Sequence, residues 1–433
     1  MDSTIERQTM HKVYSRILPF AIVTYFFCYL DRINVGFAAL TMNSEIGLTA
    51  TTFGNAAGLF FWGYFMFELP SNIIMDRVGA RIWIARIMVS WGLMSFATAF
   101  VTGPISFGVM RFLLGVAEAG FFPGMILFFT YWFPDHHRAR IVAGFAIALP
   151  LAIGLGGPIS TAVMEMNGLL GMSGWRWLFM VEAIPTILLG IAVLVLITDK
   201  PEQAGWLSPA ERDWLGRTLD RERAQKDAVR IYSMLGAMFD PKVLLLALNY
   251  FGIVTASLGM AYFIPQIIKQ LGLSNLQVGF TTMIPYLCGA AAMIVYGRMS
   301  DRAGERRWHL FFACVTACLG LVLAAATTGT WWSIVGMSIA AMGFYGSKGP
   351  FFAMPSMFMS GTAIAVSLAW INSLGNLGGY FGPSIVGYAR DHSHNFASGM
   401  YVLAGFAAMS AVVAAFALRQ PRAAEIPMGA PAE

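Results

Sequence analysis

Residues 72–81 read NIIMDRVGAR, and residues 297–307 read GRMSDRAGERR. The two stretches share the pattern Asp-Arg-x-Gly-x-Arg, and each follows the second long apolar segment in its half of the chain. The same spacing at equivalent places indicates that the chain consists of two related halves. Internal repeats of this kind are common in membrane proteins.

The segments around these loops are strongly apolar. Of the 433 residues, 57% are hydrophobic and 12% are charged, whereas a soluble protein usually carries about 25% charged residues. So few charges cannot cover a water-exposed surface, and continuous apolar runs favour helices over the alternating pattern of a membrane β-barrel. A helix crosses the hydrocarbon layer with about 20 residues, so the sequence predicts an all-α membrane protein with twelve transmembrane helices in two six-helix halves. The predicted spans are 17–40, 53–75, 82–102, 105–132, 141–165, 175–198, 243–270, 277–299, 309–328, 331–358, 361–389 and 395–418.

The positions of Lys and Arg predict the orientation of these helices. Most of the 28 Lys and Arg residues lie in the N-terminal tail, in the loops that follow even-numbered spans, and in the polar segments beyond. Positive loops stay on the cytoplasmic side, so both termini are expected to be cytoplasmic in a multi-pass cell-membrane protein, with the bacterial inner membrane as its expected location. The predicted divisions are an N-terminal half over 1–198, a central loop over 199–242, a C-terminal half over 243–418 and a tail over 419–433.

Other features of the composition exclude several classes of function. The net charge of +5 reflects the topology signal, so no nucleic-acid partner is expected. The central-loop sequence SPAERDWLGRTLDRER predicts a surface helix capped by Ser208, with Pro209 in the first turn. No Gly-rich phosphate loop occurs, which disfavours ATP-driven pumping. No cofactor is expected, and the chain is expected to be monomeric. The four cysteines lie in apolar runs and are interpreted as packing residues without disulfides: Cys28, Cys288, Cys314 and Cys318.

A basic cluster, HHRAR over 136–140, follows the fourth span. Adjacent His side chains on a helix are expected to diverge, so His136 and His137 are interpreted as residues that contact lipid headgroups or set the topology, and not as a metal site.

The duplicated loop resembles the signature loop of the major facilitator superfamily, with Asn72 in place of the first Gly of the first copy. Further stretches resemble the anion:cation symporter branch of that superfamily. The resemblance covers nearly the whole chain, and it implies proton-driven uptake of small carboxylates such as tartrate, phthalate, hydroxyphenylacetate, nicotinate or sugar acids, with membrane lipid as the surroundings. These stretches are YLDRINVGFAA (29–39), ELPSN (68–72), RFLLGVAEAGFFPG (111–124) and NSLGNLGG (372–379).

Four charged residues lie inside the predicted spans, where each is a functional hypothesis by default. Asp31 and Arg32 lie past the middle of the first span. Arg111 and Glu118 are seven residues apart in the fourth span, so they share one helix face. If both spans line one cavity, as the family fold implies, the four charges meet there and sum to zero.

This set suggests how an anion and a proton would bind together. Glu118 is predicted to be the main proton site and Asp31 the second, and Arg111 and Arg32 are predicted to bind the carboxylate. A proton on one acid frees an Arg for the substrate, so the two would bind cooperatively. The alternative is that these residues form structural ion pairs between the two spans.

Other candidates are less determined. Lys348, in the sequence YGSKGP, could meet a second acidic group or extend toward water. Asn372 is predicted to contact the substrate and Asn376 to pack between helices, and Tyr64 is a candidate wall residue. Glu68, Glu165 and Glu182 are interpreted as structural residues near helix ends, where water is expected to reach them. The duplicated loops are predicted to form the cytoplasmic gate, through Asp76, Arg77, Arg81, Asp301, Arg302 and Arg306.

The leading hypothesis is a proton-coupled symporter that imports a small organic anion by alternating access. A sugar-acid symporter of the same branch and an efflux antiporter are the alternatives, although two basic residues in the cavity argue against cationic drugs. A membrane enzyme is disfavoured because the six His residues lie at span ends and in loops. A sensor that binds without transport stays open.

Overall fold

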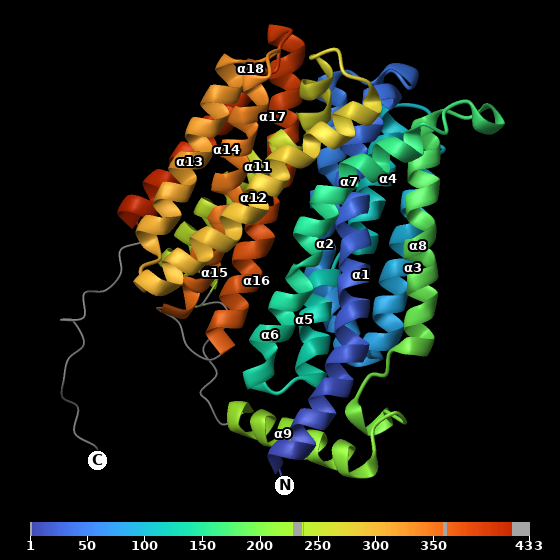
Figure 1. The fold of residues 1–433 in the computed structure, drawn as a ribbon, viewed down its shortest axis with the longest axis vertical. Helices are drawn as coiled ribbons and strands as arrows, with labels where there is room; N and C mark the ends of the chain where they lie inside the picture. The colour runs from blue at the N-terminus through green and yellow to red at the C-terminus, as the bar shows by residue number, and fades with distance from the viewer. Residues whose placement is uncertain (1, 228–235, 237, 358–361, 418–433) are drawn as a thin grey trace.

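A computed structural model describes residues 2–227, 236, 238–357 and 362–417, and these residues form helices and connecting loops without a strand. Figure 1 shows the helices α1–α8 gathered on one side of the molecule and α11–α18 on the other, with α9 lying across the end that carries the N-terminus. We call this end the α9 end and the opposite end the far end. Helices pack within each half, as α3 does on α8 and α13 on α14, and also between the halves, as α2 does on α17 and α7 on α12.

The helices of the first half are α1 (Asp2–Glu45), α2 (Ala50–Val78), α3 (Ala80–Thr98), α4 (Pro104–Glu118), α5 (Phe121–Trp132), α6 (Asp135–Ala146), α7 (Ala148–Met164), η1 (Leu169–Gly171) and α8 (Gly174–Leu196). The connecting segment forms η2 (Pro201–Gln203) and α9 (Pro209–Asp227). The second half forms α11 (Pro241–Lys269), α12 (Asn275–Ala303), α13 (Arg307–Ala326), α14 (Trp332–Gly346), α15 (Lys348–Ala353), η3 (Pro355–Met357), α16 (Thr362–Asn376), α17 (Gly378–Ser393), α18 (Ala397–Val412) and the π-helical turn η4 (Val413–Ala417).

Four predicted spans are interrupted in the structure. The span predicted at 105–132 is divided between α4 and α5, where Gly120 adopts a left-handed conformation with φ 88°. Glycine enters this region without the steric cost that a Cβ atom would add. The other interrupted spans are 141–165, 331–358 and 361–389, which break at Ile147, Ser347 and Leu377.

Eight helical stretches among the described residues are long and apolar enough to cross a membrane. They are α1, α8, α11, α12, α13, α18 with η4, and two pairs that each count as one stretch across a break, α4 with α5 and α6 with α7. The all-helical membrane fold is therefore confirmed, whereas the count of twelve spans, the division points and the cytoplasmic termini stay predictions.

The two halves approach each other very closely at the far end. A Cβ atom on Gly54 of α2 would collide with the carbonyl oxygen of Pro383 in α17, and one on Gly387 would collide with that of Ala50. Asp391, at the end of α17, accepts hydrogen bonds from the backbone N–H groups of Ala50 and Thr51 at 3.2 and 2.8 Å. It thus caps α2 across the boundary between the halves.

The connecting helix α9 is anchored to α1. Its predicted cap is confirmed: the backbone N–H of Ser208 donates to Glu211 at 2.7 Å, and the backbone N–H of Glu211 donates to the Ser208 hydroxyl at 3.3 Å. Lys12 of α1 donates to Glu211 at 2.9 Å. Burial alone would raise the pKa of Glu211, but the hydrogen bonds with Lys12 and Ser208 lower the pKa below its ordinary value. The contact is therefore present at neutral pH and is lost only in acid.

Candidate functional site

A pair of close helices places Arg111 and Glu118 in the interior. Gly115 lies between these two residues on α4, and a Cβ atom there would collide with the carbonyl oxygen of Phe60 on α2. The missing side chain lets α2 and α4 come together, so Arg111 and Glu118 are 0% and 1% exposed. The helix α4 ends at Glu118, directly before the break at Gly120.

Glu118 forms an ion pair with Arg32 of α1. The guanidinium Nη2 of Arg32 binds Glu118 Oε1, and the thiol of Cys28 donates to the same oxygen at 3.3 Å. The second oxygen, Oε2, is buried and has no hydrogen-bond partner among the described residues. Arg32 and Glu118 therefore contact each other as predicted, and Oε2 of Glu118 has no partner in the described part of the chain.

Arg111 has a neutral partner. Its Nη2 donates to the hydroxyl of Tyr262 at 3.3 Å, and Tyr262 belongs to α11 in the other half of the chain. Its Nε and Nη1 are buried without an acceptor in the part of the chain that the structure describes. A buried cation is costly unless it is paired, so two unfilled donors on one guanidinium indicate a place for an anion.

Aromatic rings surround both cations. The ring of Phe60 lies 5.1 Å from the Cζ atom of Arg111 and 5.2 Å from that of Arg32. Tyr29 and the predicted wall residue Tyr64 lie 5.2 and 5.5 Å from Arg32 Cζ. Each ring face attracts a cation, which compensates in part for the desolvation of the two guanidinium groups.

Asp31 lies apart from this group, although it is adjacent to Arg32 in the sequence. Its carboxylate accepts hydrogen bonds from Trp91 Nε1 at 2.7 Å, from Ser95 at 3.3 Å and from Thr186 at 3.2 Å. These partners belong to α3 and α8, whereas Arg32 is paired with Glu118 of α4. The group nearest the unfilled Arg111 donors, which we call the cavity group, therefore consists of Arg32, Arg111 and Glu118, whose own charges sum to +1; Asp31 and Glu68 interact with this group electrostatically from outside it.

Glu68 connects the two halves, and its expected position near water is wrong. The residue is 7% exposed, and it accepts hydrogen bonds from Asn372 Nδ2 at 3.3 Å and from the Ser373 hydroxyl at 2.7 Å. Glu68 is on α2 and both donors are on α16. Asn372 therefore lies at the boundary between the halves, and Asn376 is the half-buried last residue of the same helix. Their roles toward a substrate stay predictions.

Lys348 begins α15, directly after the break that follows α14. It is half-buried, and its Nζ lies 5.3 Å from the centre of the Tyr345 ring. The face of the Tyr345 ring attracts the ammonium group of Lys348. This contact is compatible with either predicted role of the lysine.

The two copies of the duplicated loop differ in their contacts. In the first copy, Asp76 accepts a hydrogen bond from the Tyr131 hydroxyl at 3.0 Å, and the backbone N–H of Arg81 donates to Asp199 at 2.8 Å. Arg77 is exposed. Asp199 therefore caps α3, and Gly79 leaves room for that carboxylate.

In the second copy, Asp301 forms an ion pair with Arg306 at 2.6 Å, and Arg306 also donates to the Ser300 hydroxyl at 3.0 Å. Arg302 is exposed. All these residues lie at the α9 end, where the prediction places the gate, and the gating role itself stays a prediction.

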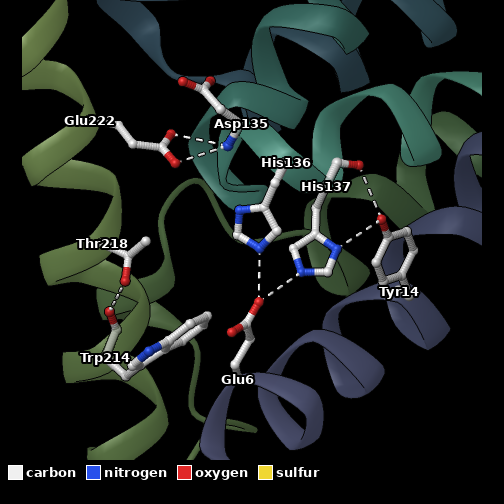
Figure 2. A network of polar contacts seen from close by, with 8 residues as sticks. All are labelled: Glu6, Tyr14, Asp135, His136, His137, Trp214, Thr218 and Glu222. Carbon is white, nitrogen blue, oxygen red and sulfur yellow. Dashed lines mark hydrogen bonds and ion pairs between the residues drawn. The ribbon is translucent and has the colours of Figure 1, made fainter. Parts of the chain in front are cut away.

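The expectation that His136 and His137 diverge is wrong. Figure 2 shows both rings directed at Glu6 of α1, and their Nε2 atoms lie 2.8 and 3.4 Å from Glu6 Oε1. His137 also accepts a hydrogen bond from the hydroxyl of Tyr14 through its backbone oxygen at 3.1 Å. The rings converge because they lie in the first turn of α6, against the N-terminal extension of α1. Within the described residues, these three side chains form a group whose ligand atoms lie within 4.8 Å of one another, the spacing that a metal ion would need.

Several residues at the site were not predicted from the sequence. Tyr262 carries no local signal, since the nearest charged residue of its span is Lys269, seven residues further along. Cys28 lies one turn before Arg32, so its position beside the charges could have been noticed; all four cysteines are free, as expected. Glu182 is 3% exposed and not near water, whereas Glu165 is exposed as expected.

Comparison with known proteins gives a consistent result. The model of the family described as "Major Facilitator Superfamily" matches residues 21–383. A protein of Agrobacterium vitis named "Putative tartrate transporter" is 48% identical over 413 residues, which cover 95% of each chain. A "Quinolone resistance transporter" of Acinetobacter baumannii is 37% identical over 399 residues, or 92% of each chain. In structure, the chain is similar to a bacterial homologue of the human lysosomal transporter Spinster, with a TM-score of 0.77 and 14% identity over 94% of this chain and 97% of the other.

Proposed function

Because this chain belongs to the Major Facilitator Superfamily of membrane transporters, we propose that it is a proton-coupled symporter that imports a small organic anion by alternating access. Tartrate is the preferred candidate substrate, and other dicarboxylates or aromatic acids are the next candidates. The substrate would bind between the two halves of the chain, beside Arg32, Arg111 and Glu118.

One observation carries this proposal: Arg111 is fully buried, and two of its guanidinium nitrogens have no acceptor among the described residues. A carboxylate can accept two parallel hydrogen bonds from such a fork. The third nitrogen contacts Tyr262 of the other half. An anion on Arg111 would therefore lie where both halves can contact it, as alternating access requires.

The charges at the site favour coupling to protons. With Glu118 ionised, the cavity group carries +1; with Glu118 protonated, it carries +2. A dianion such as tartrate would therefore be fully neutralised when Glu118 holds a proton. Proton and dianion stabilise each other's binding in this scheme, and that mutual stabilisation is the thermodynamic basis of symport.

The preference for tartrate is supported by the similarity to the Agrobacterium vitis proteins. Two of them share 48% and 47% identity with this chain over nearly its whole length. The aromatic rings around the two Arg residues leave the guanidinium edges for polar contacts, which suits a short, highly oxygenated acid.

The proposal is tested by uptake of radiolabelled L-tartrate into liposomes that contain the purified protein. We expect accumulation above the external concentration when the outside is acidic, and equilibration alone when a sodium gradient replaces the pH gradient. Liposomes without protein give the background. Accumulation driven by sodium, or no tartrate transport in any gradient, would contradict the proposal.

An efflux antiporter is the second candidate, since the Acinetobacter baumannii relative is named for quinolone resistance. Quinolones carry a carboxylate on an aromatic ring system, which the same Arg residues and rings could bind. The direction of transport distinguishes the two functions. Antiport predicts that quinolone leaves preloaded liposomes as protons enter, and that acidic medium gives no accumulation of tartrate.

Lys348 should distinguish dianions from monoanions. If Lys348 contributes to the cavity, it adds one positive charge from the second half of the chain. We expect Lys348→Met to weaken tartrate binding about tenfold, roughly 1.4 kcal/mol, and to leave a matched monocarboxylate almost unchanged. Isothermal titration of both acids measures the effect. Equal losses for both acids would show that Lys348 acts only through packing against Tyr345.

A further inference from the structure

Glu182 is a buried acid that the function proposed above does not use. It lies on α8 and is 3% exposed. Its two oxygens accept hydrogen bonds from Asn34 Nδ2 of α1 at 2.9 Å and from the Ser160 hydroxyl of α7 at 2.8 Å. Ionisable side chains at such positions in membrane proteins are expensive to keep and usually serve a function.

Among the residues that the structure describes, no cation is bonded to Glu182 from the helices around it. On α1, the nearby charged residues are Asp31 and Arg32, and Arg32 is paired with Glu118. On α3, Arg81 and Arg86 lie in the first two turns, and Arg86 donates to the carbonyl oxygen of Ala117 on α4 at 3.4 Å. The helix α7 contains no charged residue. On α8 itself, the other charged residue is Arg176, which pairs with Glu45 at the far end.

The charged group closest to Glu182 is another acid. Thr186, one turn further along α8, donates to Asp31 Oδ2 at 3.2 Å, so the Asp31 and Glu182 carboxyl groups lie on the same side of α8 and interact electrostatically. Two carboxylates cannot both stay ionised in a poorly solvated site without a cation. At least one proton therefore belongs to this pair.

The hydrogen-bond partners indicate which acid exchanges the proton. Asp31 is bound by the Ser95 and Thr186 hydroxyls and also by the indole N–H of Trp91; the indole can only donate, so it favours the ionised form of Asp31. The partners of Glu182 are an amide and a hydroxyl, and both can either donate or accept. Asn34 Oδ1 is buried and has no partner among the described residues. A half-turn of this amide exchanges Oδ1 and Nδ2, so Asn34 can donate to the carboxylate or accept from the protonated acid.

We propose that Glu182 is a proton-binding residue of the transport cycle, in a buried carboxyl pair with Asp31. The proposal rests on the proton-coupled transport proposed above. On binding, the proton adds to a Glu182 oxygen, and the O–H donates to Asn34 Oδ1 or to the Ser160 oxygen. On release, it returns to water and the carboxylate again accepts from both groups.

The position of Glu182 connects its proton to the movement of the two halves. Its partner Asn34 is two residues from Gly36, whose position leaves room for the backbone oxygen of Tyr262 in α11. Its partner Ser160 is three residues from Gly157, which lies against the backbone of Gly279 in α12. A change in the Glu182 hydrogen bonds therefore acts on α1 and α7 where both helices contact the second half.

The first test is the proton stoichiometry of transport. In liposomes with a clamped membrane potential, a series of pH differences is imposed. At each pH difference, we measure the ratio of internal to external tartrate at which net flux stops. The slope of the logarithm of this ratio against the pH difference gives the number of protons per substrate. We expect Glu182→Gln to lower this number by one. Glu165→Gln is the matched control, since Glu165 is an exposed acid at the end of α7, and its slope should equal that of the wild type.

The second test does not depend on transport. Infrared difference spectra of the purified protein between acid and alkaline pH should contain a carbonyl band from a protonated buried carboxyl group. We expect one component of this band to disappear in Glu182→Gln and to persist in Glu165→Gln. An unchanged slope together with an unchanged band would overturn the proposal. A wild-type slope of zero would refute proton symport, and the infrared band would still decide whether Glu182 binds a proton.

Discussion

Arg111→Ala should abolish specific substrate binding. The change removes the two buried donors that have no partner in the described part of the chain, and truncation of one member of a buried charged pair costs about 2–5 kcal/mol. We therefore expect the Kd for tartrate to rise by about 10²–10³-fold, which corresponds to roughly 3–4 kcal/mol. Isothermal titration of the purified variant measures this change.

The same variant should fold normally. A buried cation whose one bonded partner is the neutral Tyr262 gives little to stability, so we expect its Tm without ligand to stay equal or to rise. Arg111→Lys should restore little binding, because an ammonium group cannot form the two parallel hydrogen bonds of a guanidinium. Arg390→Ala is the matched control, since Arg390 lies in the last turn of α17 against Phe396, outside the cavity group. Tartrate binding by Arg111→Ala with wild-type affinity would rule out the assigned role.

Glu118→Gln should separate binding from proton coupling. Glutamine resembles the protonated acid in shape, and its amide oxygen can still accept from Arg32 and Cys28, which now contact Glu118 Oε1. We expect the variant to bind tartrate and to exchange internal for external tartrate at rates close to those of the wild type. We expect accumulation driven by a pH gradient to fall, because the Glu118 side chain no longer releases a proton and only the proton proposed for Glu182 remains to drive uptake.

The exchange of tartrate and its accumulation are measured in the same liposome preparation. A difference between these two activities therefore cannot come from the amount of active protein. Loss of both activities would indicate that the Arg32–Glu118 ion pair holds α1 and α4 together and has no coupling role. Full accumulation by Glu118→Gln would move the coupling proton to another acid, and Glu182 and Asp31 would be the next residues to test.

Most of the fold could be predicted from the sequence, because long apolar segments and a duplicated loop depend on local composition. The breaks inside predicted spans were harder to predict. Hydropathy does not distinguish a straight helix from one that is interrupted at Gly120, since both bury the same apolar side chains. The cap of α9 was predictable because Ser208 and Glu211 act through neighbouring backbone groups.

The candidate site was predictable only in part. Spacing places Arg111 and Glu118 on one face of a helix, and the structure agrees. The direction of Asp31 depends on Trp91 and Thr186, which are distant in the sequence and carry no charge to attract attention. The prediction that Glu182 lies at a water-accessible helix end was wrong for the same reason, because its polar partners, Asn34 and Ser160, come from two other helices. Such contacts follow from tertiary packing and not from any local pattern.

The glycine contacts at the far end have a consequence for the entropy of the transport cycle. Where Gly54 faces Pro383 and Gly387 faces Ala50, closure brings backbone against backbone. Freezing a long, flexible side chain in an interface costs up to about 2 kcal/mol of rotamer entropy, but a glycine has no rotamers to lose. If the halves move as proposed above, this contact would break and re-form in every turnover with little entropic penalty, and the free energy of substrate and proton binding would determine which conformation is populated.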